Sequence, residues 1–262
     1  MTGARALAAA CRVEAGKLRH SRAPVLSAAG IALAPVMTGV FVVALRAPRR
    51  SSELVAGKAD LFGAAATWPG FVQLLLTVYV AGGLVVTGVV SAWIFGREFS
   101  DRTAADLLAT PVSRSAIVTA KFAVTAVWCA VLAAVVLAGG LLVGAVLGLP
   151  GWTDVVVVDA AAKVAAVYAF NVLLTTPIAF AASAGRGYLP AVGLVMVLVV
   201  LAQTLAMVGA GTWFPWSVPA FATGVVAPDA GTVGPVGYLL VGLVAVAGAG
   251  LTAAWWQRAD HR

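Results

Sequence analysis

The chain has 262 residues, 62% of them hydrophobic and only 10% charged, with a formal net charge of +7. Soluble domains carry about 25% charged residues, so this composition excludes an ordinary soluble protein and indicates a membrane protein. The basic residues are scattered along the chain and are not gathered with aromatic residues, which argues against a nucleic-acid partner.

Six runs of the chain contain no charged residue, and each exceeds the ~20 residues of a membrane-spanning helix. These runs are 23–45, 61–96, 122–153, 164–185, 187–228 and 230–257. The fifth run has the length of two helices, but Gly211, Pro215 and Pro219 interrupt its second half, and the lipid core does not tolerate unsatisfied backbone groups. The sequence therefore predicts an all-α, polytopic membrane protein with six spans in a single transmembrane domain over residues 1–262.

The distribution of basic residues predicts the orientation of these spans. With the amino terminus inside, twelve Lys and Arg residues fall on the cytoplasmic side and five on the outer side. Because cytoplasmic loops are enriched in Lys and Arg, this count favours an amino terminus inside. The protein is expected to be a multi-pass protein of the cytoplasmic (inner) membrane. Both termini and Ser113 are expected in the cytoplasm, with Ser51 and Thr223 outside.

Residues 1–22 precede the first span. Arg5, Arg12 and Arg19 recur every seven positions and share one helix face, while another face is apolar. This pattern is typical of an amphipathic helix on the inner leaflet, and equally of a plain basic flank beside a span. The first span is predicted over 24–45, followed by a polar outer loop.

The second span is predicted over 70–95. Thr77, Ala81, Leu84, Gly88 and Ser91 follow one face by steps of three and four, with Gln73 one turn earlier. A stripe of small and polar residues faces protein rather than lipid. Gln73 and Thr77 are therefore candidates either for helix packing or for the lining of a transport path.

The loop 97–121 places charged residues between two apolar runs. It predicts a cytoplasmic helix of about three turns over Glu98–Ala109, with Glu98 and Arg102 spaced i,i+4 for an ion pair. Pro111 is expected to end this helix and Ser113 to cap the next one. A solvated loop helix between two spans has the same geometry.

The third span is predicted over 116–147, and three glycines spaced by four lie near its end: Gly140, Gly144 and Gly148. Such a row lets another backbone approach closely. Packing within the chain and packing against a second subunit both fit this pattern.

The fourth span, predicted over 160–183, is the most polar. Tyr168, Asn171 and Thr175 share a face, and Pro177 interrupts the hydrogen-bond ladder. These three side chains are candidates for a transport path or for interhelical hydrogen bonds. Asp159 and Lys163 form an i,i+4 pair at the start of the span.

The last two spans are predicted over 189–209 and 235–257. Between them, residues 211–228 are too apolar for an ordinary loop and too interrupted by glycine and proline for a span. Trp213 and Trp216 suit a membrane interface. The segment is therefore predicted to be a shallow outer re-entrant element.

The sequence lacks the residues that several chemical functions require. No GxxxxGK[ST] motif occurs, so the chain has no P-loop for ATP hydrolysis. His20 and His261 stand at opposite ends and suggest no metal site, and Cys11 and Cys129 are badly placed to pair. The charge-free centres of the spans offer no ionisable relay for proton-coupled transport. The chain is therefore not expected to be an enzyme.

Three separated motifs follow one another along the chain. The first is the loop pattern of Glu98, Leu107, Leu108, Pro111, Ser113, Arg114 and Lys121. The second is Ala182-Ser183-x-x-Arg186-Gly187-Tyr188, and the third is Phe214-Pro215-Trp216-x-x-Pro219. These motifs resemble those of type-2 ATP-binding cassette (ABC) exporter permeases, in particular the bacitracin-type permease subunits. Residues 1–22, with Glu14-x-x-Lys17-Leu18-Arg19, also resemble the connecting helix with which this family commonly begins.

This resemblance implies the function. The chain would be the membrane subunit of an exporter, with ATP and Mg bound by a separate ATPase subunit and a second permease subunit completing a homodimer or heterodimer. The loop after the second span would be the coupling helix that docks on the ATPase, through Glu98, Asp101, Arg102, Leu107, Leu108, Pro111 and Arg114. An antibiotic, a peptide or another amphipathic compound would be the substrate. The alternatives are an ATP-independent channel or carrier and a membrane anchor without transport.

Overall fold

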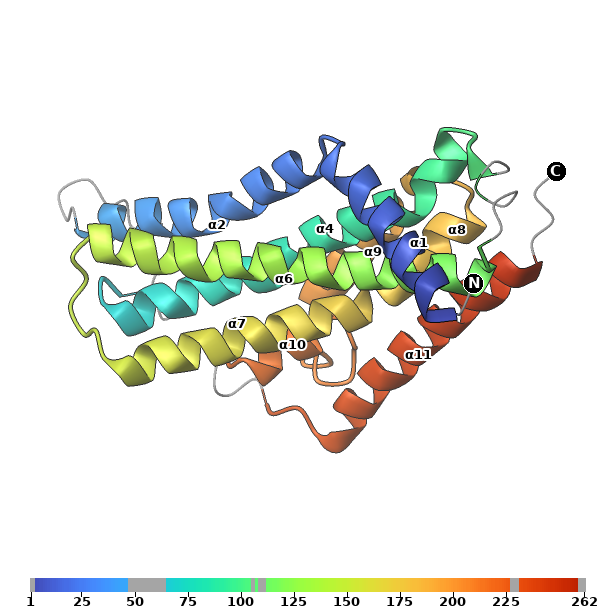
Figure 1. The fold of residues 1–262 in the computed structure, drawn as a ribbon. Helices are drawn as coiled ribbons and strands as arrows, with labels where there is room; N and C mark the ends of the chain where they lie inside the picture. The colour runs from blue at the N-terminus through green and yellow to red at the C-terminus, as the bar shows by residue number, and fades with distance from the viewer. Residues whose placement is uncertain (1–2, 47–64, 105–106, 108–111, 227–230, 259–262) are drawn as a thin grey trace.

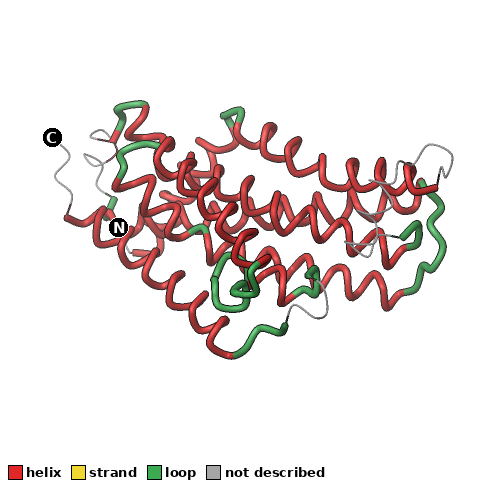
Figure 2. The backbone as a smooth tube through the Cα atoms, turned by 180° about the vertical axis from the view of Figure 1, so that it is seen from behind, coloured by secondary structure: helices red, strands yellow, loops and turns green. Residues whose placement is uncertain are grey.

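The computed structural model of the chain describes residues 3–46, 65–104, 107, 112–226 and 231–258. In this part of the chain the regular elements are all helices, joined by loops (Figure 2). Six helical segments are long and apolar enough to cross a membrane. They are α2 (Ala23–Arg46), α4 (Trp68–Ser100), α6 (Arg114–Val146), α7 (Asp154–Leu174) continued by α8 (Thr176–Ala184), α9 (Tyr188–Met207) and α11 (Pro235–Arg258). The prediction of an all-α protein with six spans is thus confirmed.

The helices form one elongated bundle (Figure 1). α2, α4, α6 and α7 run side by side, and α1 (Gly3–Arg19) crosses the first part of α6. The first turn of α1 and the last turn of α11 lie at the same end (Figure 1). Because the turn after α4 and the start of α6 also lie there, this end is called the charged end below.

The helices beside the charged end are longer than predicted. α4 continues to Ser100, past the predicted limit at residue 95, and so includes Arg97 and Glu98. α6 begins at Arg114, where Ser113 accepts a hydrogen bond from the amide of Ala116 as predicted for a capping residue.

The predicted helix over Glu98–Ala109 is wrong in its first part. The amide of Thr103 donates to the carbonyl of Glu98 at 2.8 Å, and Arg102 has a positive φ of 58°. This combination is a Schellman-type helix end, which closes α4 and turns the chain before any new helix begins. Glu98 therefore belongs to the second span and not to the loop.

The fourth span is interrupted where its proline predicts. Pro177 has no amide hydrogen, so the carbonyl of Leu173 loses its normal helical partner. The hydroxyl of Thr176 lies 2.9 Å from that carbonyl and also 2.9 Å from the carbonyl of Ala245 in α11. The break between α7 and α8 is thus satisfied by a side chain, as a membrane interior requires.

Two apolar cores lie one after the other along the bundle. The first is built from α2, the first half of α4, the second half of α6 and α7, and includes Phe71 and Leu132. The second lies toward the charged end, where α8, α9 and α11 join, and includes Phe95 and Ile178. Trp128 of α6 packs against both cores.

The glycine row of the third span packs within the chain. A side-chain carbon at Gly140 would meet Leu75, and one at Gly144 would meet the ring of Trp68, both on α4. Gly148 lies in the turn after α6 with a φ of +56° and has open space around it. Of the two alternatives for this row, Gly140 and Gly144 therefore serve close packing between α4 and α6 of one chain.

The segment after α9 folds back against the bundle. It contains the short helix α10 (Val218–Ala222), and Val218, Pro219 and Phe221 are buried. The hydroxyl of Ser217 donates to the carbonyl of Ala202 at 2.9 Å, and the side-chain Nε2 of Gln73 donates to the carbonyl of Gly224 at 2.7 Å. These bonds hold the segment against α9 and α4. The last two residues of the predicted re-entrant range, 227–228, lie outside the described residues.

Candidate functional site

Four charged side chains meet at the charged end of the bundle, brought there by three different helices. Glu14 and Lys17 come from α1, Glu98 from the last turns of α4, and Lys121 from the second turn of α6. Glu14, Glu98 and Lys121 are at most 5% exposed. We call these four residues the ion-pair ring.

Each carboxylate of the ring bridges both ammonium groups. The Nζ atom of Lys121 lies 3.0 Å from Oε2 of Glu14 and 2.9 Å from Oε2 of Glu98. The Nζ atom of Lys17 lies 2.6 Å from Oε1 of Glu14 and 3.0 Å from Oε1 of Glu98. Lys121 makes a third bond, to the carbonyl of Ile94 at 2.8 Å. The ring is closed and has no net charge.

Such complete pairing is what makes burial of the four charges tolerable. An unpaired buried charge costs several kcal/mol, and attraction offsets this only where geometry and hydrogen bonds are good. Burial lowers the pKa of Lys17, but the carboxylates of Glu98 and Glu14 outweigh it, so that its pKa is raised above the ordinary value. The contribution of Lys17 to stability is therefore fully present below its unfolded pKa and is lost only as the pH rises through the folded pKa.

The ring is joined to the end of α11 through aromatic residues. The Nζ atom of Lys121 lies 5.9 Å from the ring centroids of both Phe95 and Trp256, within the range of cation–π contacts. Trp256 is fully buried, and its Nε1 donates to the hydroxyl of Ser183 in α8 at 3.0 Å. Lys121 thus links the ring to α11, and Trp256 links α11 to α8.

The residues predicted to contact an ATPase lie in different environments. Asp101 and Arg102 are exposed in the turn that follows α4, and Leu107 is partly buried in the second core. Arg114 donates to the carbonyls of Trp256 and Gln257 and so closes the end of α11. Leu108 and Pro111 lie outside the described residues.

The structure corrects the predicted partner and the predicted role of Glu98. Its expected i,i+4 partner was Arg102, but the structure pairs Glu98 with Lys17 and Lys121, and Arg97 instead lies 3.9 Å from Asp101. α4 ends at Ser100, and Arg102, in the turn that follows, has a positive φ of 58°, so the i,i+4 geometry of a helix does not extend from Glu98 to Arg102. With 2% of its surface exposed, Glu98 holds the helix end in place and is not itself a contact surface.

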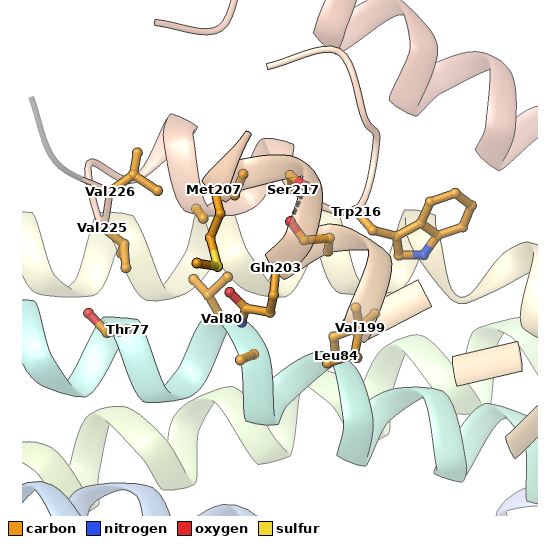
Figure 3. Close-up of a pocket in the computed structure, with 14 residues that line it drawn as sticks. Thr77, Val80, Leu84, Val199, Gln203, Met207, Trp216, Ser217, Val225 and Val226 are labelled. Atoms are coloured by element: carbon orange, nitrogen blue, oxygen red, sulfur yellow. Dashed lines mark hydrogen bonds between the residues drawn. The ribbon is translucent and has the colours of Figure 1, made fainter. Parts of the chain in front are cut away.

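A cavity of about 320 Å³ lies farther along the bundle, between α4, α9 and the segment after α9. Thr77, Ala81 and Leu84 of the predicted stripe line it from α4. Figure 3 shows the side chains of Gln203 and Met207 from α9 beside Val80 of α4, with Trp216 at the edge of the group. The wall is apolar apart from a few polar groups, a composition that suits an amphipathic molecule.

The polar candidates of the fourth span lie elsewhere. Asn171 is 2% exposed, and its Nδ2 is buried without a hydrogen-bond partner among the described residues. Thr175 is buried at the helix break, where its backbone carbonyl accepts a bond from Ser91, and Tyr168 packs against the first core. Thr77 thus lines the cavity and Gln73 bonds to Gly224, whereas these three are inside the helix packing. The predicted pair at the start of the span is present, with Asp159 and Lys163 2.8 Å apart.

Sequence analysis missed the ion-pair ring because its members come from three distant segments. One signal was available: Glu14 and Lys17 are three residues apart and lie away from the face of Arg12 and Arg19. Two opposite charges on the inward face of an amphipathic helix call for partners on the helices it covers. The cavity was not predicted for a similar reason: α4 lines it on one side, and α9 and the segment after α9, which are distant from α4 in the sequence, line the other.

Comparison with known proteins agrees with the geometry. Residues 10–202, most of the chain, match the family described as ABC-2 family transporter protein. The bacitracin transport permease protein BCRB of Bacillus licheniformis is 24% identical over 135 residues, which is 52% of this chain and 65% of that relative. The alignment thus covers slightly less than two thirds of the relative's length. The search of solved structures gave no match.

The family match covers α1 except for its first turns. It also covers the four residues of the ion-pair ring and the spans from α2 to most of α9. It therefore includes the ion-pair ring and the α4 side of the cavity, whereas α11 and the last turns of α9 lie outside it. With six helices fit to cross a membrane and a family match over most of its length, this chain is a multi-pass membrane protein that belongs to the ABC-2 family of transporter proteins.

Proposed function

We propose that the chain is the permease subunit of an ABC exporter of the cytoplasmic membrane, driven by ATP and Mg bound to a separate ATPase chain. The observation that carries this proposal is the ion-pair ring. It fixes α1, α4 and α6 to one another at the end where the exposed turn Asp101–Thr103 leaves the bundle. A force applied to that turn would act on α4 and, through the ion-pair ring, on α1 and α6.

The cavity between α4 and α9 supplies the second part of the proposal. Its apolar wall and its polar groups, among them Thr77, Gln203 and Ser217, fit an amphipathic substrate such as an antibiotic or a peptide. The relative named for bacitracin transport supports this substrate class. A second permease subunit, either a copy of this chain or a related one, would complete the transporter.

The orientation follows from the charge distribution and has a direct test. We expect the charged end in the cytoplasm, because twelve of seventeen basic residues fall on that side. In a background without Cys11 and Cys129, Ser115→Cys should react with an impermeant thiol reagent only after the cells are opened. Thr232→Cys should react in intact cells. Thr223, which was also predicted to lie outside, is not used because it is only 2% exposed. Labelling of Ser115→Cys from outside would reverse the orientation.

Coupling to an ATPase is tested with two arginines in the same backbone conformation. Arg102 and Arg186 are both exposed and have φ values of 58° and 50°, but only Arg102 lies in the turn after α4. If that turn docks on the ATPase, Arg102→Ala should weaken binding of the ATPase to the permease in nanodiscs by about 30-fold, the effect of losing ~2 kcal/mol at an interface. Arg186→Ala serves as the control and should bind as wild type does.

The same experiment separates the alternatives. Equal binding by both variants would show that the turn after α4 is not the docking surface. Failure of wild-type permease to bind the ATPase encoded with it, combined with transport in the absence of ATP, would favour the ATP-independent channel or carrier.

A further inference from the structure

A second cavity lies at the corner between α1 and the start of α2. It is a groove of about 530 Å³ lined from α1 by Cys11, Ala15, Leu18 and Arg19, from α2 by Pro24, and from α6 by Ala123, Val124, Val127 and Trp128. Arg19 is the only charged residue in this lining. Leu18 and Val124 are buried at 6% and 8% exposure, while Val127 is 66% exposed. The groove therefore has a closed apolar floor and an open side along a membrane span.

Cations border this groove on one side. A helix turns by about 100° per residue, so Arg12 and Arg19 lie on one flank of the row Cys11–Ala15–Leu18, and Glu14 lies on the other. Glu14 is engaged in the ion-pair ring. In the described part of the chain, by contrast, no hydrogen bond or ion pair joins the side chain of Arg12 or Arg19 to another group, and both residues are exposed.

An apolar groove beside unpaired cations at the entry of a span complements a phospholipid, which has apolar acyl chains and a charged phosphate. The indole of Trp128, which donates to the hydroxyl of Ser27 at 3.0 Å, adds a side chain typical of the membrane interface. A second copy of the chain is a poor occupant, because a symmetric contact would bring the same arginines face to face. We propose that this groove holds one acyl chain of an anionic phospholipid whose phosphate is bound by Arg19.

The proposal differs from general attraction between a basic helix and an anionic membrane. General attraction depends on the number of cations near the surface, each changing lipid affinity by about fivefold, wherever it stands on the helix. A site instead depends on one cation and on free space in the groove. Two matched pairs of variants separate these descriptions.

The first pair changes the groove itself. Val127→Trp places a large side chain in the groove, whereas Val158→Trp makes the same change on α7 at an equally exposed position, with exposures of 66% and 67%. The second pair removes one charge: Arg19→Gln inside the groove, and Arg5→Gln on the same helix about 20 Å away. Both arginines are exposed, so neither change is expected to unfold the chain.

The measurement is native mass spectrometry of purified permease released from nanodiscs that contain equal amounts of phosphatidylglycerol and phosphatidylcholine with identical acyl chains. Wild type, Val158→Trp and Arg5→Gln should retain phosphatidylglycerol in preference to phosphatidylcholine. Arg19→Gln should reduce that preference by about fivefold or more, and Val127→Trp should abolish retention of either lipid. No ATPase or ATP is present, so the result does not depend on the proposed transport function.

Three results would overturn the site. Equal retention of the two lipids by wild type would remove the role of the phosphate charge. An equal effect of Arg5→Gln and Arg19→Gln would reduce the observation to general attraction. Unchanged retention by Val127→Trp would show that no acyl chain occupies the groove.

Discussion

Glu98→Gln is expected to destabilise the permease by about 3–5 kcal/mol, the cost of removing one partner from a buried ion pair. The substitution keeps the shape of the side chain but leaves Lys121, which has no exposed surface, and Lys17 with a single carboxylate between them. SDS-induced unfolding of the purified protein in mixed micelles measures this change. Asp101→Asn is the control, because Asp101 is exposed and its contact with Arg97 is 3.9 Å long; it should change stability by less than ~1 kcal/mol.

A double variant tests whether the ring acts as a unit. Lys121→Met combined with Glu98→Gln removes one ammonium and one carboxylate, and leaves the Glu14–Lys17 pair intact. The large cost of each single change comes from the buried charge left without its partner, and the double variant leaves no such charge, so its loss should be smaller than the sum of the single losses. Additive losses would show that Glu98 and Lys121 do not depend on each other.

Gly144→Leu is expected to destabilise the chain by ~1–3 kcal/mol or more, because a side chain at this position meets the buried ring of Trp68. Ala145→Leu, one residue later on the exposed face of α6, should stay within about 0.5 kcal/mol of wild type. The same unfolding titration compares the two variants. Trp68→Ala should recover part of the loss when combined with Gly144→Leu, since it removes the atoms that clash. If Gly144→Leu weakened only the association of subunits and left the single chain unchanged, the glycine row would belong to a subunit interface.

The sequence was sufficient for the spans because their signal is local. Each charge-free run predicts one helix from its own composition, and Pro177 marks the break in the fourth span without reference to any other residue. The stripe that contains Thr77 follows from helical spacing alone, and it proved to face the cavity and α9. Local rules of this kind need no knowledge of which helices are neighbours.

The ion-pair ring could not be found in this way. Glu14 and Lys121 are 107 residues apart, and their contact exists only because α1 crosses α6. Sequence spacing offered Glu98 a partner four residues away, but α4 ends at Ser100 before it reaches Arg102, and Lys17 of α1 pairs with the carboxylate. Tertiary packing thus turned an apparent surface residue into a buried one, which is the step that propensity and spacing do not contain.

The break in the fourth span has a mechanical consequence. The level of Thr175 and Pro177 is also where the two apolar cores meet, and Trp128 is shared between them. At this level the fourth span is interrupted, and the carbonyl of Leu173 that Pro177 leaves without a helical partner is satisfied by the hydroxyl of Thr176. A span interrupted by proline bends more easily than a continuous helix. Bending of the fourth span at this break would move α8, which packs against α4 and α9, the two helices that line the cavity.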